Sequence, residues 1–299
     1  MKKKILTTIF IALFFLAGLS LLLYPLVSNE WNSYRQSKLM AGYDEALIQQ
    51  EEEGTIDYTE LWEKAKAYNE ALLPSVLPDS FAVAQAEGED SEAYRTYMDC
   101  LNPLGDGMMG TVEIPKINVK LPVFHTTEET VLEQAAGHLQ GSSLPVGGES
   151  THAVISAHRG LPSAALFTDL DRLEEGDHFL LHILDDTLCY QVDQILVVEP
   201  EETENLAVEE GKDLVTLLTC TPYGVNSHRL LVRGHRVAYE PESIEEEEHT
   251  PLASISLHTN YLFWAAAGLA ATAAAIVLLA FLDRKRRKKA EDRGAKEQT

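Results

Sequence analysis

The chain has 299 residues, which is enough for one catalytic domain of ordinary size with accessory segments. It is acidic, with 24 lysine and arginine residues against 47 aspartate and glutamate residues and a formal net charge of −23. Such a field repels nucleic acid and other anionic polymers, so nucleic-acid binding is disfavoured.

Two apolar stretches predict membrane spans. Residues 5–27 are almost uninterruptedly apolar, and at about 1.5 Å rise per residue such a helix crosses a hydrocarbon core of about 30 Å. Residues 261–282 form a second apolar run, followed at once by the basic block at 284–289. A signal peptide is the alternative for the first run, and a buried core helix for the second. The positive-inside rule predicts that residues 1–4 and 283–299 are cytoplasmic and that everything between the spans lies outside the cell.

The region between the spans divides into three parts and carries 13 basic and 43 acidic residues, a net charge of −30. Residues 28–107 begin with helical composition, and we expect two helices that separate at 53–54. Proline and acidic residues then break the periodicity, so that 81–92 is typical of a lid or of a plain linker. Residues 241–260 form an acidic linker, in which calcium binding by 245–248 is an alternative to a solvated charge run.

Residues 108–240 predict a mixed, mostly β domain. Short apolar runs separated by turns are typical of a barrel or sandwich. We expect strands within 110–124, 152–156, 178–184, 189–198, 214–220 and 229–237. Short helices are expected at 128–136 and 163–170.

Cys220 is the candidate nucleophile. It closes an apolar strand and precedes Thr-Pro, so its side chain should lie at the rim of the domain, where a thiol is accessible. An odd count of three cysteines in an oxidising exterior leaves at least one thiol unpaired. Cys189 begins a strand with nothing chemically suggestive beside it, and whether it forms a bridge with Cys100 stays open.

Two further polar residues at strand ends can activate this thiol. A thiol with a pKa of about 8.5 is only a few per cent thiolate at pH 7, so it needs a base or a cation beside it. His158 is the candidate base, which can also protonate a departing amine, although most lone histidines are structural. Arg229 opens the strand that follows loop 221–228, so it can face Cys220 across a hairpin and donate to an oxyanion. Arg233 lies about 13 Å further along at roughly 3.3 Å per residue and is the weaker choice, and a surface salt bridge is the alternative role for either arginine.

These segments resemble the sortase family of cysteine transpeptidases. Residues 216–220 (TLLTC) match the TLxTC signature of sortases, His158 falls in their histidine segment, and Arg229 lies nine residues after the cysteine. The resemblance extends over 108–240. Three longer segments resemble class C, pilus-assembling sortases in particular, at 110–117, 157–177 and 219–236.

The resemblance implies a fold and a reaction. The fold is an eight-stranded β-barrel with short helices, preceded by a helical lid region and flanked by the two spans. Cys220 would attack the Thr–Gly bond of an LPXTG-like sorting signal, and a pilin lysine amine would resolve the thioacyl enzyme. His158 would act as general acid and base, Arg229 would orient the substrate and stabilise the oxyanion, and Thr219 would help to position the substrate. No metal or organic cofactor is implied.

The lid region departs from the class C pattern. Class C sortases usually carry an Asp-Pro-aromatic triplet that covers the cysteine, whereas this chain has the order Pro78-Asp79-Ser80-Phe81. We hypothesise that Asp79 and Phe81 plug the site. Two alternative functions remain, a housekeeping sortase that attaches proteins to peptidoglycan and a non-catalytic membrane scaffold that binds extended peptides at strand edges.

Overall fold

The computed structural model describes residues 2–72, 77, 79–81, 91–241, 266–268, 270 and 272. The chain divides into two compact units, Met1–Leu252 and Ala253–Thr299, and the first contains every described strand.

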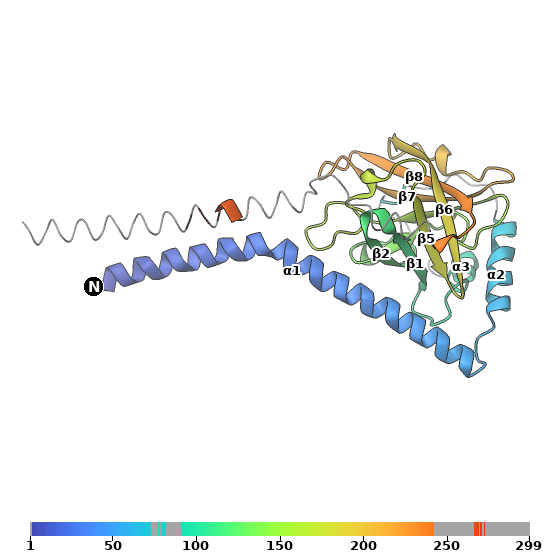
Figure 1. Ribbon diagram of the computed structural model, residues 1–299, viewed down its shortest axis with the longest axis horizontal. Coiled ribbons are helices and arrows are strands. Elements are labelled where there is room, and N and C mark those ends of the chain that lie inside the picture. The colour runs from blue at the N-terminus through green and yellow to red at the C-terminus, as the bar shows by residue number, and fades with distance from the viewer. Residues whose placement is uncertain are drawn as a thin grey trace, which may run out of the picture. The chain divides into compact units, whose positions relative to one another are not determined.

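Eight strands close into a barrel in the order β1-β2-β3-β4-β7-β8-β6-β5 (Figure 1). They are β1 Met108–Ile114, β2 Val119–His125, β3 Ala136–His138, β4 Thr151–Ser156, β5 His178–Ile183, β6 Asp186–Val198, β7 Asp213–Thr221 and β8 His228–Val237. Closure pairs every strand on both sides, so the barrel has no open edge. The expectation of a mostly β, eight-stranded barrel is confirmed.

The relative directions of strands β4, β7 and β8 determine where the candidate site lies. Strands β7 and β8 are antiparallel and joined by a short turn, whereas β4 and β7 run parallel. The carboxyl ends of β4 and β7 therefore lie at the same rim, beside the start of β8. The three predicted catalytic residues belong to this rim, because His158 follows β4, Cys220 lies near the end of β7 and Arg229 lies near the start of β8.

The barrel interior is filled by apolar side chains, including the fully buried Val112, Ile155, Phe179, Leu217 and Val232. Alternate residues of a strand point to opposite faces, and the barrel core takes one set. The other face of β4 and β7 is also buried, because a second cluster covers it with Leu77 and Phe81. Both strands consequently lack the polar alternation of a half-exposed strand.

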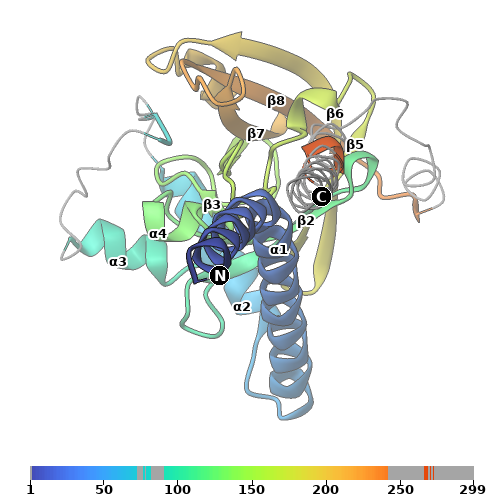
Figure 2. The same ribbon diagram turned by 90° about the vertical axis from the view of Figure 1, so that its left-hand side faces the viewer.

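Between residues 2 and 241, the described part of the chain contains four α-helices: α1 Lys2–Glu52, α2 Tyr58–Ala71, α3 Glu92–Met98 and α4 Glu129–Leu132. The break between α1 and α2 confirms the predicted separation at 53–54, where Gly54 adopts a φ of 65° and Asp57 caps α2 by accepting from the Glu60 amide. Helix α1 runs past β2 (Figure 2) and packs Met40 and Tyr43 against Met108.

One local prediction was wrong, and a second was too long. The expected helix at 163–170 is a series of turns that ends in the 3-10 helix η2 Leu170–Arg172, and Leu166 has a positive φ of 44° that a helix cannot include. The helix expected at 128–136 is only α4, because its last residue already begins β3. Neither β3 nor α3 was predicted.

Within the part of the chain that the structure describes, no helix has the length and apolar composition required to cross a membrane. The spans at 5–27 and 261–282 stay predictions. The possible calcium ligands at 245–248, the rest of the acidic linker beyond residue 241, and the basic tail at 283–299 lie outside the described residues.

Candidate active site

Cys220 and Arg229 face each other across the hairpin of β7 and β8. They are direct partners in the antiparallel register, so their side chains lie on the same face of the barrel wall. Both side chains are largely buried. Cys220, Cys100 and Cys189 form no disulfide, which answers the open question about a bridge between the latter two. The predicted facing of Cys220 and Arg229 across the hairpin is therefore observed, and their catalytic roles stay predictions.

His158 reaches the same rim from the neighbouring parallel strand. Ser156 of β4 lies opposite Leu218 of β7, and His158 and Cys220 are each two residues further along. The ladder continues past the last strand residue, because the Ala157 amide donates to the Leu218 carbonyl over 3.2 Å. Because each residue lies two positions beyond the Ser156–Leu218 pair, the His158 imidazole and the Cys220 thiol reach the same level of the rim.

Thr219 joins the two strands rather than facing solvent. Its hydroxyl donates to the Ala157 carbonyl over 2.7 Å, and its side chain is fully buried. This hydrogen bond holds the residue before His158 against the residue before Cys220. The predicted role of Thr219 in positioning the substrate stays a prediction.

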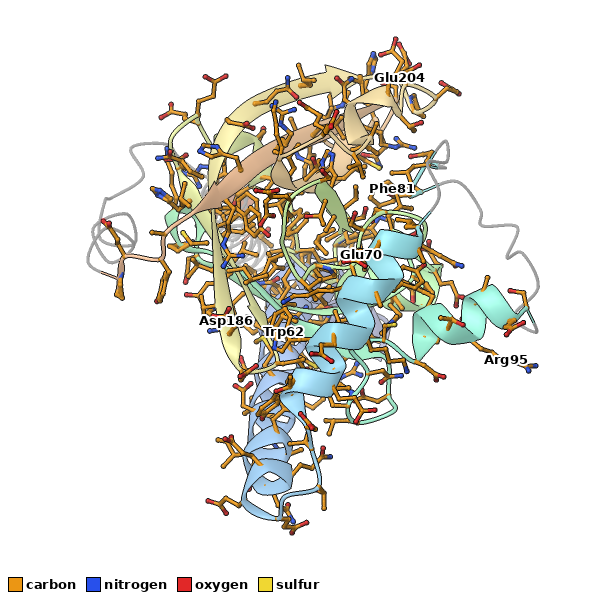
Figure 3. The ribbon with its side chains drawn as sticks, turned by 90° about the vertical axis from the view of Figure 1, so that its right-hand side faces the viewer. Trp62, Glu70, Phe81, Arg95, Asp186 and Glu204 are labelled. Atoms are coloured by element: carbon orange, nitrogen blue, oxygen red, sulfur yellow. The ribbon has the colours of Figure 1, made fainter. Side chains whose placement is uncertain are left out.

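Two residues of the proposed lid contact this rim. Asp79 accepts two hydrogen bonds from Arg229, from Nε at 2.7 Å and from Nη2 at 2.6 Å, in a bidentate ion pair. The ring of Phe81 (Figure 3) lies 5.2 Å from the His158 ring and 5.3 Å from the guanidinium carbon of Arg229. Asp79 therefore binds the edge of the arginine, and Phe81 lies against both the arginine and the histidine.

Comparison with known proteins agrees with this geometry. Residues 112–237 match the profile of the sortase domain. A sortase C1 from Streptococcus agalactiae is 45% identical, covering 68% of this chain and 100% of that chain with a TM-score of 0.60. The chain belongs to the sortase family. A sortase C from Streptococcus pneumoniae is also 45% identical, covering 68% of this chain and 97% of that chain with a TM-score of 0.58, and both neighbours support class C.

The sequence match to curated sortases is shorter than the structural one. Sortase D of Bacillus subtilis is 30% identical over 131 residues, which are 43% of this chain and 63% of that protein. The chain thus spans less than two thirds of the length of this relative.

The lid residues of this sortase are anchored by apolar packing as well as by charge. Leu77 is buried, and with Phe81 it packs on Val154, Leu218 and Leu231 on the outer face of the barrel. A cavity of only about 10 Å³ remains beside Asp79 and Arg229. Asp79 and Phe81 therefore lie against Arg229 and His158 at the rim, and the hypothesis that they plug the site stays a prediction.

Burial and charge together favour an uncharged thiol and imidazole in the sortase. Burial raises the pKa of Cys220; the Arg229 guanidinium opposes this shift and the Asp79 carboxylate adds to it. Burial lowers the pKa of His158, and the carboxylates of Glu129 and Glu133 oppose that shift. The site under the lid therefore disfavours the thiolate–imidazolium pair.

Arg159 is a rim residue that the sequence did not single out. Its guanidinium donates from Nη1 to the Thr221 hydroxyl over 3.2 Å and forms an ion pair with Asp171. It thereby connects the residue after His158 to the residue after Cys220. A buried arginine beside the histidine could not be distinguished from an exposed one by its sequence context.

Arg233, the weaker candidate from the sequence, lies in a different environment from Arg229. It pairs with Asp193 at 2.9 and 3.1 Å and with Glu209 at 2.7 Å, and its strand partner is Thr216 rather than Cys220. Its partners keep it in a salt-bridge cluster near the middle of β8.

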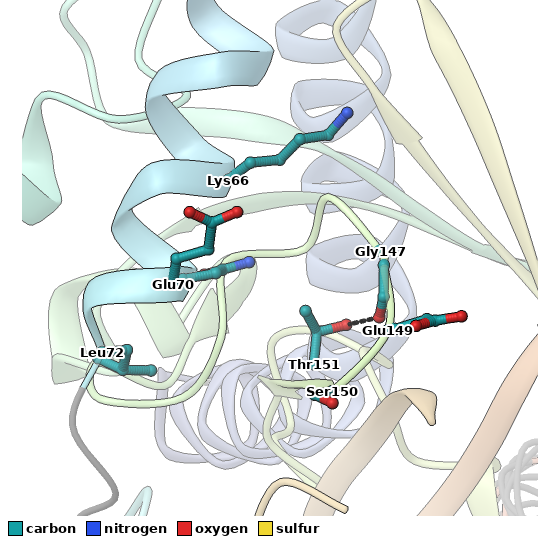
Figure 4. A pocket seen from close by; sticks show the side chains of 9 residues that line it. Lys66, Glu70, Leu72, Gly147, Glu149, Ser150 and Thr151 are labelled. Carbon is teal, nitrogen blue, oxygen red and sulfur yellow. Dashed lines mark hydrogen bonds between the residues drawn. The ribbon is translucent and has the colours of Figure 1, made fainter. Parts of the chain in front are cut away.

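A larger cavity lies at the opposite end of β4 from His158. It has a volume of about 430 Å³ (Figure 4), with Lys66 and Glu70 of α2 on one side and Thr151 on the other. Among the described residues, no group of three histidine, cysteine, aspartate or glutamate side chains is arranged to hold a metal ion.

Proposed function

We propose that this sortase is a cell-surface cysteine transpeptidase that cleaves LPXTG-like sorting signals between Thr and Gly and transfers the acyl group to a pilin lysine amine. The observation that carries the proposal is the pairing of the free thiol of Cys220 with Arg229, with His158 at the same rim of the adjacent strand. The likeness to class C sortases supports the pilin substrate, because the Streptococcus pneumoniae structure was described in connection with pilin substrate specificity.

In the first half-reaction, the Cys220 thiolate attacks the carbonyl carbon of the threonine. Negative charge then develops on the carbonyl oxygen, and the Arg229 guanidinium can stabilise it once its donors are released from Asp79. The C–N bond breaks while protonated His158 donates its proton to the leaving glycine amine. The product is a thioester between Cys220 and the threonine, with a neutral imidazole beside it.

In the second half-reaction, the lysine amine of the acceptor attacks the thioester. Neutral His158 accepts the proton that the amine loses, and the C–S bond breaks to regenerate the Cys220 thiolate. The acceptor ends with an isopeptide bond to the threonine. The thiolate and the imidazolium are restored as a pair, so the enzyme is ready for another sorting signal.

We further propose that residues 5–27 and 261–282 anchor the enzyme with both termini in the cytoplasm and the barrel outside. Basic residues precede the first run and follow the second, and this distribution favours cytoplasmic termini. A catalytic domain held at the outer membrane face would meet pilins during their export.

The test uses the purified full-length protein, an LPXTG-like peptide and a pilin-derived lysine peptide. We expect a thioacyl adduct on Cys220 by mass spectrometry and an isopeptide-linked product. Cys220→Ala should abolish both, whereas Cys189→Ala, a matched change of another buried cysteine outside any disulfide, should retain them. Ligation to a glycine or cell-wall amine in preference to the lysine peptide would favour a housekeeping sortase. Peptide binding without any adduct would favour a non-catalytic scaffold.

A further inference from the structure

Helix α4 brings a carboxylate to the outer side of His158. Glu129 is the first residue of this helix, and its Oε1 lies 3.7 Å from Nε2 of His158. The imidazole is mostly buried at 18% exposure, whereas the Glu129 side chain is 73% exposed. Within the described part of the chain, Nε2 makes no hydrogen bond. An acceptor therefore lies close to a ring nitrogen that is otherwise unsatisfied.

We propose that Glu129 is a positioning residue for His158, whose carboxylate accepts a hydrogen bond from Nε2 when the imidazole becomes protonated. The inference rests on the proposed transpeptidase function, in which His158 alternates between neutral and protonated forms. Neutral imidazole carries one N–H and can leave Nε2 without a proton, whereas imidazolium carries a proton on both nitrogens and needs an acceptor for each. The long separation fits the neutral state.

The exposed Glu129 side chain is free to shorten this contact. A carboxylate needs to approach by less than about 1 Å to reach the ordinary N–H···O length of about 2.9 Å. The resulting hydrogen bond would fix the ring orientation while the other nitrogen exchanges its proton with the thiol or the amine. A third group that orients a catalytic base is a recurring element of nucleophilic catalysis.

The charges around His158 come from three directions. Glu129 and Glu133 lie on or just after α4, and both raise its pKa against the effect of burial. Cys220 lies on the neighbouring β7, and Phe81 lies near both the His158 ring and the Arg229 guanidinium. Of these two carboxylates, only Glu129 lies within ion-pair distance of His158, so Glu133 provides a matched control for charge without an ion pair.

Glu129 could instead bind the ammonium group of the acceptor lysine, and kinetics distinguish the two roles. A positioning residue affects proton transfer in both half-reactions, so its loss lowers kcat and leaves the KM for the amine nearly unchanged. Loss of a residue that binds the acceptor instead raises the KM for the amine and leaves kcat nearly unchanged.

The experiment compares wild type with Glu129→Gln, Glu129→Asp and Glu133→Gln in the full-length protein. Nuclear magnetic resonance of histidine-labelled protein follows the ring protons of His158 against pH, with the signal assigned by His158→Gln. In Glu129→Gln we expect the His158 midpoint to move to lower pH and kcat to fall about two- to fivefold, the range for a screened surface pair. Glu129→Asp should restore part of the loss, and Glu133→Gln should cause a smaller change in both.

An unchanged His158 titration in Glu129→Gln, or a rise in the amine KM alone, would overturn the inference. The titration does not depend on turnover, so it separates this inference from the proposed function. A wild-type protein that forms no thioacyl adduct refutes the transpeptidase proposal, and with it any catalytic role for Glu129, even if the titration shows the contact.

Discussion

Replacing Asp79 by alanine should release the lid of this sortase. Asp79 and Arg229 form two hydrogen bonds of 2.7 and 2.6 Å, and their side chains are only 13% and 10% exposed. Hydrogen bonds to charged groups contribute about 1.5–3 kcal/mol each, although water replaces part of this when the lid opens. We take a net weakening of about 2 kcal/mol, which lowers the ratio of closed to open lid about 30-fold, since 1.4 kcal/mol is tenfold.

The assay is the rate of alkylation of Cys220 by iodoacetamide, followed by peptide mass spectrometry on the full-length protein. If labelling requires opening, the rate in Asp79→Ala should rise by up to about 30-fold. Because the Asp79 carboxylate raises the pKa of Cys220, its removal should also move the pH midpoint of alkylation downward. Glu201→Ala is the control, since Glu201 is exposed and acts on Arg229 only through its charge. An unchanged rate and midpoint in Asp79→Ala would refute the reasoning.

Three other substitutions test the rim. Phe81→Ala should speed alkylation of Cys220. A double-mutant cycle of Phe81→Ala with Asp79→Ala should show non-additive effects on the alkylation rate, because both residues contact Arg229. Arg229→Lys keeps the charge but loses the bidentate geometry, so thiol labelling should rise while transpeptidation falls about 100-fold, measured by product formation. Thr219→Val leaves the buried Ala157 carbonyl without its partner and should lower the free energy of unfolding by about 1–3 kcal/mol in denaturant titration, and an unchanged unfolding midpoint would contradict it.

The sequence alone was enough to predict the long strands and the hairpin that carries the Cys220 thiol. Strands β6, β7 and β8 each contain a short apolar run and are bounded by turn residues, and the loop between Cys220 and Arg229 is short enough to favour a hairpin. Once the hairpin is accepted, the facing of thiol and guanidinium follows from strand register. The position of His158 beside the thiol could not be derived from the hairpin, because it depends on the parallel pairing of β4 with β7, two segments that are distant in the sequence.

The missed elements depend on tertiary contacts. Strand β3 has three residues, too few for a period of two to be recognised, and it exists because β2 and β4 pair with it on either side. The turns at 163–170 contain good helix formers, yet Asn32 of α1 donates to the Ser163 carbonyl and residue 165 donates to Asn29. Contacts with a remote helix thus replace the local hydrogen bonds that a helix would have made.

The lid illustrates the same limit at the level of single residues. Sequence comparison identified an aspartate and an aromatic residue in an unfamiliar order but could not assign their contacts. In the structure both residues contact Arg229. Asp79 binds the edge of the guanidinium, and Phe81 lies against the guanidinium and against the His158 ring. What matters for covering the site is therefore which groups reach the rim, and the order of the residues along the chain is secondary.

Substrate access and activation of the thiol are physically coupled in this arrangement. Cys220 and His158 are buried in this structure, which raises the pKa of the thiol and lowers that of the imidazole, and Asp79 binds the Arg229 guanidinium. Opening would reverse each of these effects, because water and substrate replace the lid and Arg229 regains free donors. A nucleophile kept neutral until the groove is open is protected from stray electrophiles and oxidants outside the cell. The lid would then regulate the chemistry by the same movement that admits the sorting signal.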